Sequence, residues 1–395
     1  MKKIIKKTLC IVLALIMATT VTATGFAADT DSMLLKFDEN GDFTILHLTD
    51  WHTAYPMPEI HKQYAKEALA ASDPDLVVLG GDMSEASTED YPAAVKEICD
   101  LFIEAETPFV ITFGNHDYLH DITIDDMFAL YKKYGGEYFL SKDENPDLFG
   151  CGTCSLSVYS NDESRVAYEI YCFDSGCEVE GKGYETVHPD QIEWYQNRAE
   201  ELKNANGGEY VPSVVFQHII VQEIYDKLFP VATENDPEKN ESFDGIAYRK
   251  TAIPNLSNIK DGYLMEKPCP GYYNYGQLDA MSENGDVRAM FFGHDHSNSF
   301  TVEIDGVDIV NTPSVKPHSI MKVINWGGRV ITLHEDGTYE SEVLEGYDLA
   351  DEKGSEIVDV GGVSLFEIIF TKIWKAFIKV SLVFWNFATK IFYNF

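Results

Sequence analysis

The chain has 395 residues, and 65 Asp and Glu against 30 Lys and Arg give it a formal net charge of −35. Hydrophobic residues make up 45% of the sequence and aromatic residues 13%, which is enough to build a core and excludes wholesale disorder. The acidic balance argues against a basic, nucleic-acid-binding face, and no repeat of fixed period is present. The composition therefore indicates a folded, acidic, globular protein.

The N-terminal segment has the layout of a secretory signal peptide. Four lysines lie within the first seven residues, and the apolar run Leu9–Ala18 follows them. Small residues come next, and Gly25-Phe26-Ala27 predicts cleavage after Ala27 or Ala28. The apolar run is short for a membrane-spanning helix, although an uncleaved anchor is the alternative. We therefore expect a signal peptide over residues 1–27 and a secreted or extracytoplasmic protein.

Strands and helices alternate after this segment. Phe43–Thr49 is predicted to be a buried strand, residues 59–72 have helical spacing, and Leu76–Leu79 is a second strand. A helix near residues 92–105 and a strand over Pro108–Phe113 follow. This order predicts an α/β sheet with parallel strands and with helices on its faces.

The second half of the body continues with strands. We predict strands at 166–173, 213–216 and 287–292, and two more at 300–311 and 328–334 with turns at Asp305-Gly306 and Asp336-Gly337. Residues 225–275 are rich in Pro, Asn and Gly and are interpreted as an irregular insertion that could cap a site. The acidic stretch 346–362 is interpreted as a linker.

The C-terminal residues 363–395 form a different kind of segment, dense in Phe, Ile, Val and Trp. At 100° per residue its four lysines fall on one side of a helix, and its longest charge-free run is the ten residues Val380–Thr389. We expect an amphipathic helix, with contact to a membrane surface as the first interpretation. Docking on the protein or a partner, and spanning the bilayer, are the alternatives.

Six cysteines remain once Cys10 leaves with the signal peptide. An even number in an exported chain permits disulfides, and Cys151, Cys154, Cys172 and Cys177 lie close in sequence. Disulfides, free thiols and a metal site all remain open, and none of them requires a catalytic cysteine.

Five of the predicted strands end in a short burst of Asp, Asn or His. In open α/β sheets the ligand crevice lies at the carboxyl ends of the strands, so these side chains are predicted to converge. Imidazoles, carboxylates and an amide oxygen suit Zn, Fe or Mn rather than calcium. Two such ions about 3.5–4 Å apart can clamp the oxygens of an in-line displacement at phosphorus. The candidate ligands are Asp50, His52, Asp82, Asn115, His218, His294 and His296.

With these motifs in their order, the sequence resembles the calcineurin-like metallophosphoesterases over roughly residues 43–335. The quoted motifs are Asp50-Trp51-His52, Gly81-Asp82, Gly114-Asn115-His116-Asp117, the isolated His218 and Gly293-His294-Asp295-His296. The phrase Val215-Phe-Gln-His is similar to the branch related to purple acid phosphatases. The purple enzymes, however, place a metal-binding Tyr where this chain has Glu85, and they lack the histidine present here as His52.

The resemblance implies the fold, the metals and the roles of the residues. The implied fold is a four-layer α/β/β/α sandwich, with a catalytic domain over residues 34–345. One metal would be held by Asp50, His52, Asp82 and His296, and the other by Asp82, Asn115, His218 and His294. His116 would face the substrate phosphate as the catalytic acid or charge stabiliser, and Asp117 would orient its ring.

The leading hypothesis is an exported phosphoesterase that hydrolyses phosphate monoesters of a small molecule or polymer with a metal-bound hydroxide. A phosphodiesterase acting on nucleotides, glycerophospho-headgroups or wall polymers is the alternative within the same fold. From other classes, a metal-bearing binding protein that has lost catalysis and a surface-tethered interaction protein are kept as rivals.

Overall fold

The computed structural model describes residues 33–87, 89–118, 121–143, 145–229, 241–243, 246–248, 254–316 and 326–392. The signal peptide expected over residues 1–27 lies outside these residues. Leu34–Phe395 form one compact unit, and all the elements below belong to it.

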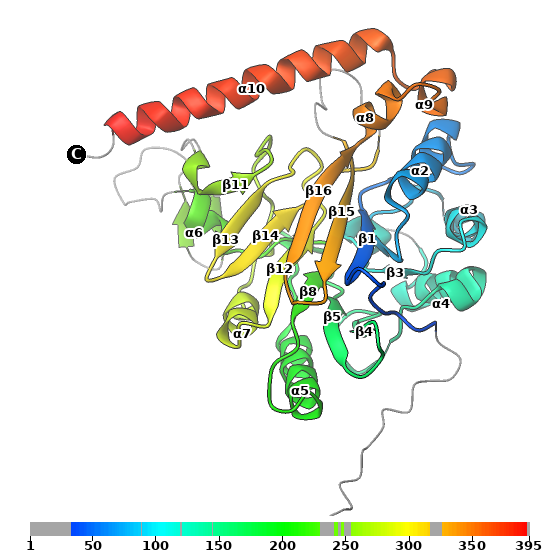
Figure 1. Ribbon diagram of the computed structural model, residues 1–395, viewed down its shortest axis with the longest axis vertical. Coiled ribbons are helices and arrows are strands. Elements are labelled where there is room, and N and C mark those ends of the chain that lie inside the picture. The colour runs from blue at the N-terminus through cyan, green and yellow to red at the C-terminus, as the bar shows by residue number, and fades with distance from the viewer. Residues whose placement is uncertain are drawn as a thin grey trace, which may run out of the picture. The chain divides into compact units, whose positions relative to one another are not determined.

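A five-stranded sheet contains the first three strands of the chain, as the sequence predicted (Figure 1). β1, β2 and β3 run parallel, whereas β15 pairs antiparallel with β1, and β16 pairs antiparallel with β15. The spatial order is β16-β15-β1-β2-β3. The strands are β1 (Asp42–Leu48), β2 (Leu76–Leu79), β3 (Phe109–Ile111), β15 (Gly327–His334) and β16 (Tyr339–Glu345).

A seven-stranded sheet contains most of the later strands. β5, β8, β12 and β14 run parallel at its centre, and antiparallel strands extend it on both sides. The spatial order is β11-β13-β14-β12-β8-β5-β4. The strands are β4 (Cys154–Tyr159), β5 (Val166–Cys172), β8 (Ser213–Phe216), β11 (Ile259–Asp261), β12 (Val287–Phe292), β13 (Thr301–Ile304) and β14 (Val307–Asn311).

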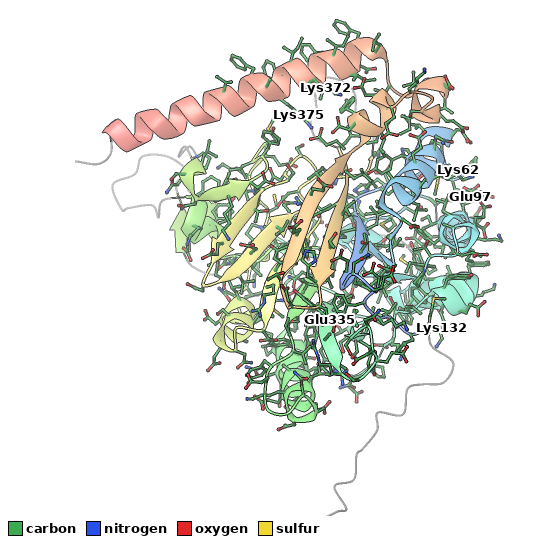
Figure 2. All side chains as sticks on the ribbon, in the orientation of Figure 1. Lys62, Glu97, Lys132, Glu335, Lys372 and Lys375 are labelled. Atoms are coloured by element: carbon green, nitrogen blue, oxygen red, sulfur yellow. The ribbon has the colours of Figure 1, made fainter. Side chains whose placement is uncertain are left out.

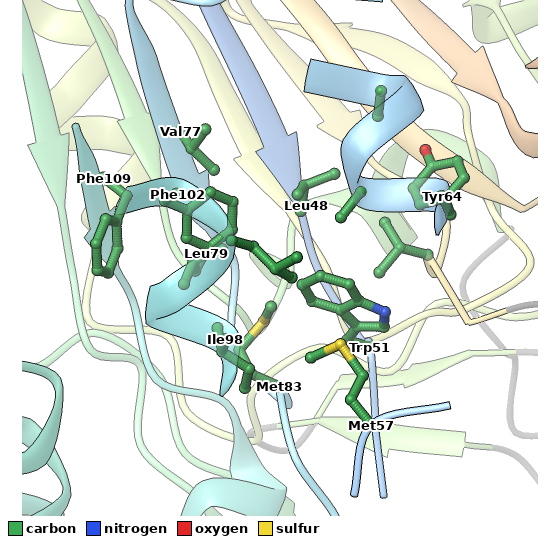
Figure 3. Close-up of a cluster of buried hydrophobic side chains, with 14 of the residues drawn as sticks. Leu48, Trp51, Met57, Tyr64, Val77, Leu79, Met83, Ile98, Phe102 and Phe109 are labelled. Carbon is green, nitrogen blue, oxygen red and sulfur yellow. The ribbon is translucent and has the colours of Figure 1, made fainter. Parts of the chain in front are cut away.

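The two sheets pack face to face because their buried strands present apolar side chains on both sides. Alternate residues of β2 point to opposite faces, as strand geometry requires. Leu76 and Val78 join a core built from both sheets, whereas Val77 and Leu79 pack against helices (Figure 3). Strands buried on both faces explain the nearly continuous apolar runs in the sequence.

Helices cover the outer face of each sheet, which confirms the four-layer α/β/β/α sandwich. α2 (Glu59–Ser72), α3 (Tyr91–Glu104) and α4 (Ile124–Gly135) share a core with the five-stranded sheet. α5 (Pro189–Ala205), α6 (Ile224–Leu228) and α7 (Gln277–Glu283) share one with the seven-stranded sheet. Lys62 of α2 and Glu97 of α3 add an ion pair of 3.3 Å between their helices (Figure 2).

Most of the predicted elements form within a residue or two of their expected bounds. The helix expected over residues 59–72 is α2, and the turns at Asp305-Gly306 and Asp336-Gly337 join β13 to β14 and β15 to β16. The insertion expected over residues 225–275 holds short elements among its described residues. They are most of α6, β9 (Glu241–Phe243), β10 (Ile246–Tyr248), the 3₁₀ turn η3 (Leu256–Asn258) and β11.

The prediction that residues 346–362 form a linker is wrong. The segment contains α8 (Gly346–Asp351) and α9 (Glu356–Asp359), and Tyr347, Leu349 and Ile357 are buried in the core beside α2. These apolar side chains occur among acidic residues at irregular intervals, so the composition hid them. The segment is therefore part of the folded unit.

The chain ends in α10 (Leu365–Phe392), which contacts α8 and η3 (Figure 1). Among the described residues, no helix combines the length and the hydropathy needed to cross a bilayer. The six cysteines from Cys99 to Cys269 are free thiols in the structure. Cys154 and Cys172 lie directly opposite each other on β4 and β5.

Candidate metal centre

The predicted ligands follow the carboxyl ends of five strands that the two sheets bring side by side. β1 ends at Leu48 and β2 at Leu79, and their loops carry the first motif and Asp82. The loops after β3, β8 and β12 carry the remaining donors. The residues that gather there are Asp50, His52, Asp82, Asn115, His116, His218, His294 and His296.

Four of these residues have left-handed backbone conformations. The φ angles are 54° at Asp50, 43° at His52, 55° at Asp82 and 68° at His294. Residues other than glycine rarely adopt φ > 0, and such strain persists only where the surrounding structure enforces it. The backbone thus turns sharply after β1, β2 and β12 and directs these four side chains toward the cluster.

The glycines of the motifs make room for the carboxylates. A Cβ added to Gly114 would lie 2.2 Å from Asp82 Oδ1, and one added to Gly293 would lie 2.7 Å from Asp50 Oδ2. Neither position can hold a larger residue without moving a predicted ligand. Glycine is therefore needed at both positions so that the backbone can approach the carboxylates of Asp82 and Asp50 closely.

One group of donors consists of Asp50, His52 and His296. The Nε2 atoms of the two histidines lie 3.1 Å apart, and His296 Nε2 lies 3.2 Å from Asp50 Oδ1. Asp50 Oδ2 accepts hydrogen bonds from Thr49 Oγ1 at 2.7 Å and from the His294 backbone N–H at 2.9 Å. One oxygen of Asp50 is thereby fixed, and the other faces the imidazoles.

A second group consists of Asp82, His218 and His294. His218 Nδ1 lies 2.7 Å from the Gly80 carbonyl oxygen, to which it donates, so its Nε2 is the atom left for a ligand. That Nε2 lies 3.2 Å from Asp82 Oδ2, which is also 3.7 Å from His52 Nε2. Asp82 therefore lies between the two groups, where a bridging carboxylate is required.

Asp117 is buried and holds the backbone around Asp82. Its Oδ2 accepts hydrogen bonds from the backbone N–H groups of Asp82 at 2.9 Å and Gly114 at 2.8 Å, and its Oδ1 accepts one from Tyr91 Oη at 3.2 Å. Among the described residues, no hydrogen bond joins Asp117 to the His116 ring. Asp117 thus supports the loops that carry Asp82 and Asn115, and its proposed effect on the orientation of the His116 ring stays a prediction.

His116 is half-buried and lies at the edge of the cluster. Its backbone N–H donates to Asp82 Oδ1 at 2.8 Å, which fixes the second oxygen of that carboxylate. Its ring stands perpendicular to that of His52, with the ring centroids 4.8 Å apart. His116 can therefore reach both the donors and the solvent side of the site.

The charges in the cluster favour a cation. Burial lowers the pKa of His52 to about 4 and that of His294 to about 3, so these imidazoles are neutral. Burial also disfavours a charged His218, yet Asp82 and Asp50 outweigh burial and raise its pKa to about 10. The two buried carboxylates thus demand a positive charge between them, which a metal ion can supply in place of a proton.

The residues present fit a pair of metal ions. Among the described residues, Asn115 Oδ1 is buried and has no hydrogen-bond partner, which is costly unless another partner is supplied. The buried Asp50 Oδ1 and His218 Nε2 face His296 Nε2 and Asp82 Oδ2, each at 3.2 Å. The donors are carboxylates, imidazoles and one amide oxygen, a set suited to Zn, Fe or Mn. Atoms of Asp50, His52 and His296, and separately of Asp82, His218 and His294, lie within 4.8 Å of one another.

Sequence reasoning missed two residues beside the cluster. Tyr184 comes from the hairpin of β6 (Glu178–Val179) and β7 (Gly183–Tyr184), and its ring centroid lies 4.3 Å from that of His294. Glu85 Oε1 lies 3.3 Å from His52 Nδ1 and 3.3 Å from Lys316 Nζ. Tyr184 lies outside every motif, so no local signal marked it. The position of Glu85 three residues after Asp82 was noted only as a departure.

Comparison with known proteins agrees with this geometry. The sequence model of the calcineurin-like phosphoesterase family matches residues 43–298. "Probable inactive purple acid phosphatase 14" of Arabidopsis thaliana is 24% identical over 332 residues, which cover 75% of this chain and 76% of that protein. "Phosphatase DCR2" of Saccharomyces cerevisiae is 24% identical over 311 residues, 70% of this chain and 48% of that protein. The expected relation to purple acid phosphatases is confirmed.

Among solved structures, a dimetal phosphatase from Danio rerio matches with a TM-score of 0.47 and 11% sequence identity. The match covers 76% of this chain and 98% of that one.

Proposed function

Because the chain belongs to the calcineurin-like phosphoesterase family, we propose that it is an exported phosphoesterase that uses two metal ions to hydrolyse phosphate monoesters. The observation that carries this proposal is the position of Asp82 between two groups of buried donors. A carboxylate placed in this way can join two cations, and two adjacent cations suit reactions at phosphorus.

The residues that would hold the metals are those expected from the sequence. Asp50, His52, Asp82 and His296 would hold one ion, and Asp82, Asn115, His218 and His294 the other. When bound, the ions would polarise the phosphate and lower the pKa of a water molecule.

The chain's own residues keep this arrangement fixed. Thr49 and the His294 backbone N–H hold Asp50, while the His116 backbone N–H holds Asp82. The Gly80 carbonyl sets the tautomer of His218. Such partners of metal ligands keep the donors oriented before substrate arrives, so little reorganisation is needed during the reaction.

His116 is the group proposed to act on the substrate. Its ring is partly exposed beside His52, so it can approach a phosphate that sits over the two groups of donors. An imidazole there can donate a proton to the leaving oxygen or stabilise negative charge on the phosphate.

A metal-bearing binding protein without catalysis is the second candidate. The name of the Arabidopsis relative includes "probable inactive", which favours this candidate. The presence of His116 and of every predicted metal ligand in this chain supports the enzyme instead.

Export is part of the proposal. The four lysines, the apolar run Leu9–Ala18 and the Gly25-Phe26-Ala27 site support it. An extracytoplasmic protein would meet phosphate esters released from polymers, lipids or small molecules.

The test compares His116→Ala with the unsubstituted protein after loading with Mn, Fe or Zn. Because His116 is not among the proposed ligands, the metal content of the His116→Ala variant should stay near that of the parent. Turnover of a phosphate monoester should fall by roughly 10²-fold or more, as for loss of a positioned imidazole. The loss should be smaller for a nitrophenyl phosphate than for an alkyl phosphate if His116 protonates the leaving group.

Other results would point elsewhere. Metal loss in parallel with activity would make His116 a ligand. A metal-loaded parent that hydrolyses neither aryl monoesters nor aryl diesters would select the binding protein. Faster turnover of the diester than of the monoester would select a phosphodiesterase.

A further inference from the structure

The outward side of α10 is an exposed apolar surface. Phe366, Ile373, Phe377 and Val380 have 69%, 65%, 62% and 68% of their area exposed, whereas Ile368 of the same helix has 2%. We call this surface the apolar stripe. Its described members are Leu365, Phe366, Ile369, Phe370, Ile373, Trp374, Phe377 and Val380.

The aromatic members of the apolar stripe form a continuous row along the helix. Phe366 and Phe370, and then Phe370 and Trp374, stack with ring centroids 6.2 Å apart, and Trp374 and Phe377 lie 5.8 Å apart. Their i, i+4 and i, i+3 spacing keeps them on one side of the helix. The row therefore belongs to a single surface.

The described lysines of α10, Lys372 and Lys375, turn the other way and bind the acidic body. Lys372 forms ion pairs with Asp351 and with Asp348, the latter at 3.5 Å, and Lys375 forms one with Glu345 (Figure 2). Since β16 ends at Glu345 and α8 carries the two aspartates, these pairs fix which side of the helix faces the protein. The lysine side expected at a membrane surface is thus occupied by the protein itself.

Along the helix, the described members of the apolar stripe run from Leu365 to Val380. At the usual rise per residue this stretch is about 24 Å long. Large apolar side chains that lie exposed along several successive turns mark a surface that contacts another molecule or a membrane.

We propose that the apolar stripe of α10 inserts into the interfacial layer of a lipid bilayer, so that the helix lies in the membrane plane and tethers the folded unit to the surface. Phe and Trp on one side of a helix with cations on the other are the composition of an interfacial helix. Aromatic side chains are also favoured at the boundary between headgroups and acyl chains.

Charge favours lipid over a second copy of the chain. Packing two stripes together would bring two bodies, each with a net charge of −35, close to each other. The acidic residues that pair with the lysines, such as Asp348 and Asp351, would lie beside that contact and add to the repulsion. A bilayer of neutral lipid carries no such repulsion.

The geometry also determines how binding depends on salt. Because the described lysines Lys372 and Lys375 are engaged with carboxylates, they contribute little attraction to anionic lipid. Insertion of uncharged side chains is the main contribution, and salt screens it little. Binding should therefore occur on phosphatidylcholine alone and persist at high salt.

The test is vesicle flotation with the unit Leu34–Phe395, which contains all the described elements and lacks the apolar run Leu9–Ala18 that would itself bind lipid. The vesicles contain either phosphatidylcholine alone or phosphatidylcholine with phosphatidylglycerol, at low and high salt. The variant Phe370→Ser/Trp374→Ser removes two central rings of the stripe. The control Met265→Ser/Val358→Ser removes two exposed apolar side chains from elsewhere.

The parent and the control should float with phosphatidylcholine vesicles at both salt concentrations. The double variant should bind these vesicles at least about tenfold more weakly. Circular dichroism and metal content should be the same in all three proteins, because the variant and the control replace side chains of matched exposure, 37–40%, far from the metal ligands. Equal binding of the variant and the parent would overturn the proposal, as would equal loss in the variant and the control.

Two further outcomes would also overturn it. Flotation only with phosphatidylglycerol, and only at low salt, would mean that lysines bring the protein to the membrane. Absence of flotation, together with a dimer that the double variant loses in sedimentation, would mean that a second copy covers the stripe.

Discussion

Asp82 uses its two carboxylate oxygens for different partners. Oδ1 accepts the His116 backbone N–H at 2.8 Å, whereas Oδ2 faces His218 at 3.2 Å and His52 at 3.7 Å. Asp117 fixes the Asp82 backbone through its N–H at 2.9 Å. One residue is therefore held on three sides and presents a single oxygen to both groups of donors.

This position predicts the effect of Asp82→Asn. The amide keeps the size of the side chain but removes the charge shared by the two sites, so the variant should retain less of both metals. His52→Ala should weaken mainly one site, and His218→Ala mainly the other. Metal-to-protein ratios after dialysis, measured by elemental analysis, check this. Two fully occupied sites in Asp82→Asn would remove the bridging role.

At the scale of the elements, the proposed metal ligands are positioned because their loops follow the carboxyl ends of strands. The strands β1, β2 and β3 run parallel, and β8 and β12 run parallel in the second sheet, so the loops of each set leave from one edge. Packing of the two sheets brings both edges together, which explains why donors from five loops meet. The sandwich is thus the reason that the motifs work as one site.

The C-terminal helix α10 has a buried beginning and an exposed continuation. Its first turns join the core through Val363, just before the helix, and through Ile368, which are 4% and 2% exposed. Beyond Lys375, the described side chains Phe377 and Val380 are exposed. The start of α10 is therefore structural, whereas Phe377 and Val380 are available for another role.

Two truncations should separate these parts. A chain that ends at Ala376 keeps the described buried residues of α10 and the ion pairs of Lys372 and Lys375, so its urea midpoint should match that of the parent. A chain that ends at Gly362 loses Val363 and Ile368 from the core, which should lower the free energy of unfolding by about 2–5 kcal/mol. Both should keep turnover, because the proposed ligands end at His296. If the Ala376 chain were as unstable as the Gly362 chain, the outer half of α10 would also be structural.

At the scale of the whole molecule, the acidic charge and the metal centre are coupled. The buried carboxylates of Asp50 and Asp82 lie in a chain of net charge −35, and burial together with Asp82 raises the pKa of Asp117 to about 7. Metal ions would compensate negative charge where the fold concentrates it. Bound cations are thus expected to stabilise the folded state as well as to serve catalysis.

Removal of the metals should therefore lower the melting temperature. Occupancy at about 100 times the dissociation constant contributes roughly 2.7 kcal/mol per site, which is equivalent to about 3–4 °C per site for a chain of this size. Calorimetry before and after chelation measures the difference, and Mn, Fe or Zn should restore it. Asp82→Asn serves as the control, since it should respond much less to the chelator. An unchanged melting temperature in the parent would show that the centre adds no stability.

The sequence by itself was sufficient to predict the alternating strands and helices and to name the donors, and the resemblance to the family implied the sandwich. The motifs are local patterns, in which Asp50 and His52, or His294 and His296, lie two residues apart. Strand and helix periods are local too, so α2 formed over the predicted residues 59–72. These features depend on spacing within a few residues, which a single sequence displays directly.

Only the tertiary structure decided the rest, because the remaining contacts join distant parts of the chain. His52 and His296 meet across 244 positions, and Tyr184 reaches His294 from a hairpin with no motif. The spacing of the lysines in α10 predicted their common side but not its direction, which Asp351 and Glu345 set by forming ion pairs. For the same reason Tyr347, Leu349 and Ile357 joined the core, although residues 346–362 were expected to be a linker. Burial depends on what the rest of the fold places against a segment, and local composition does not contain that information.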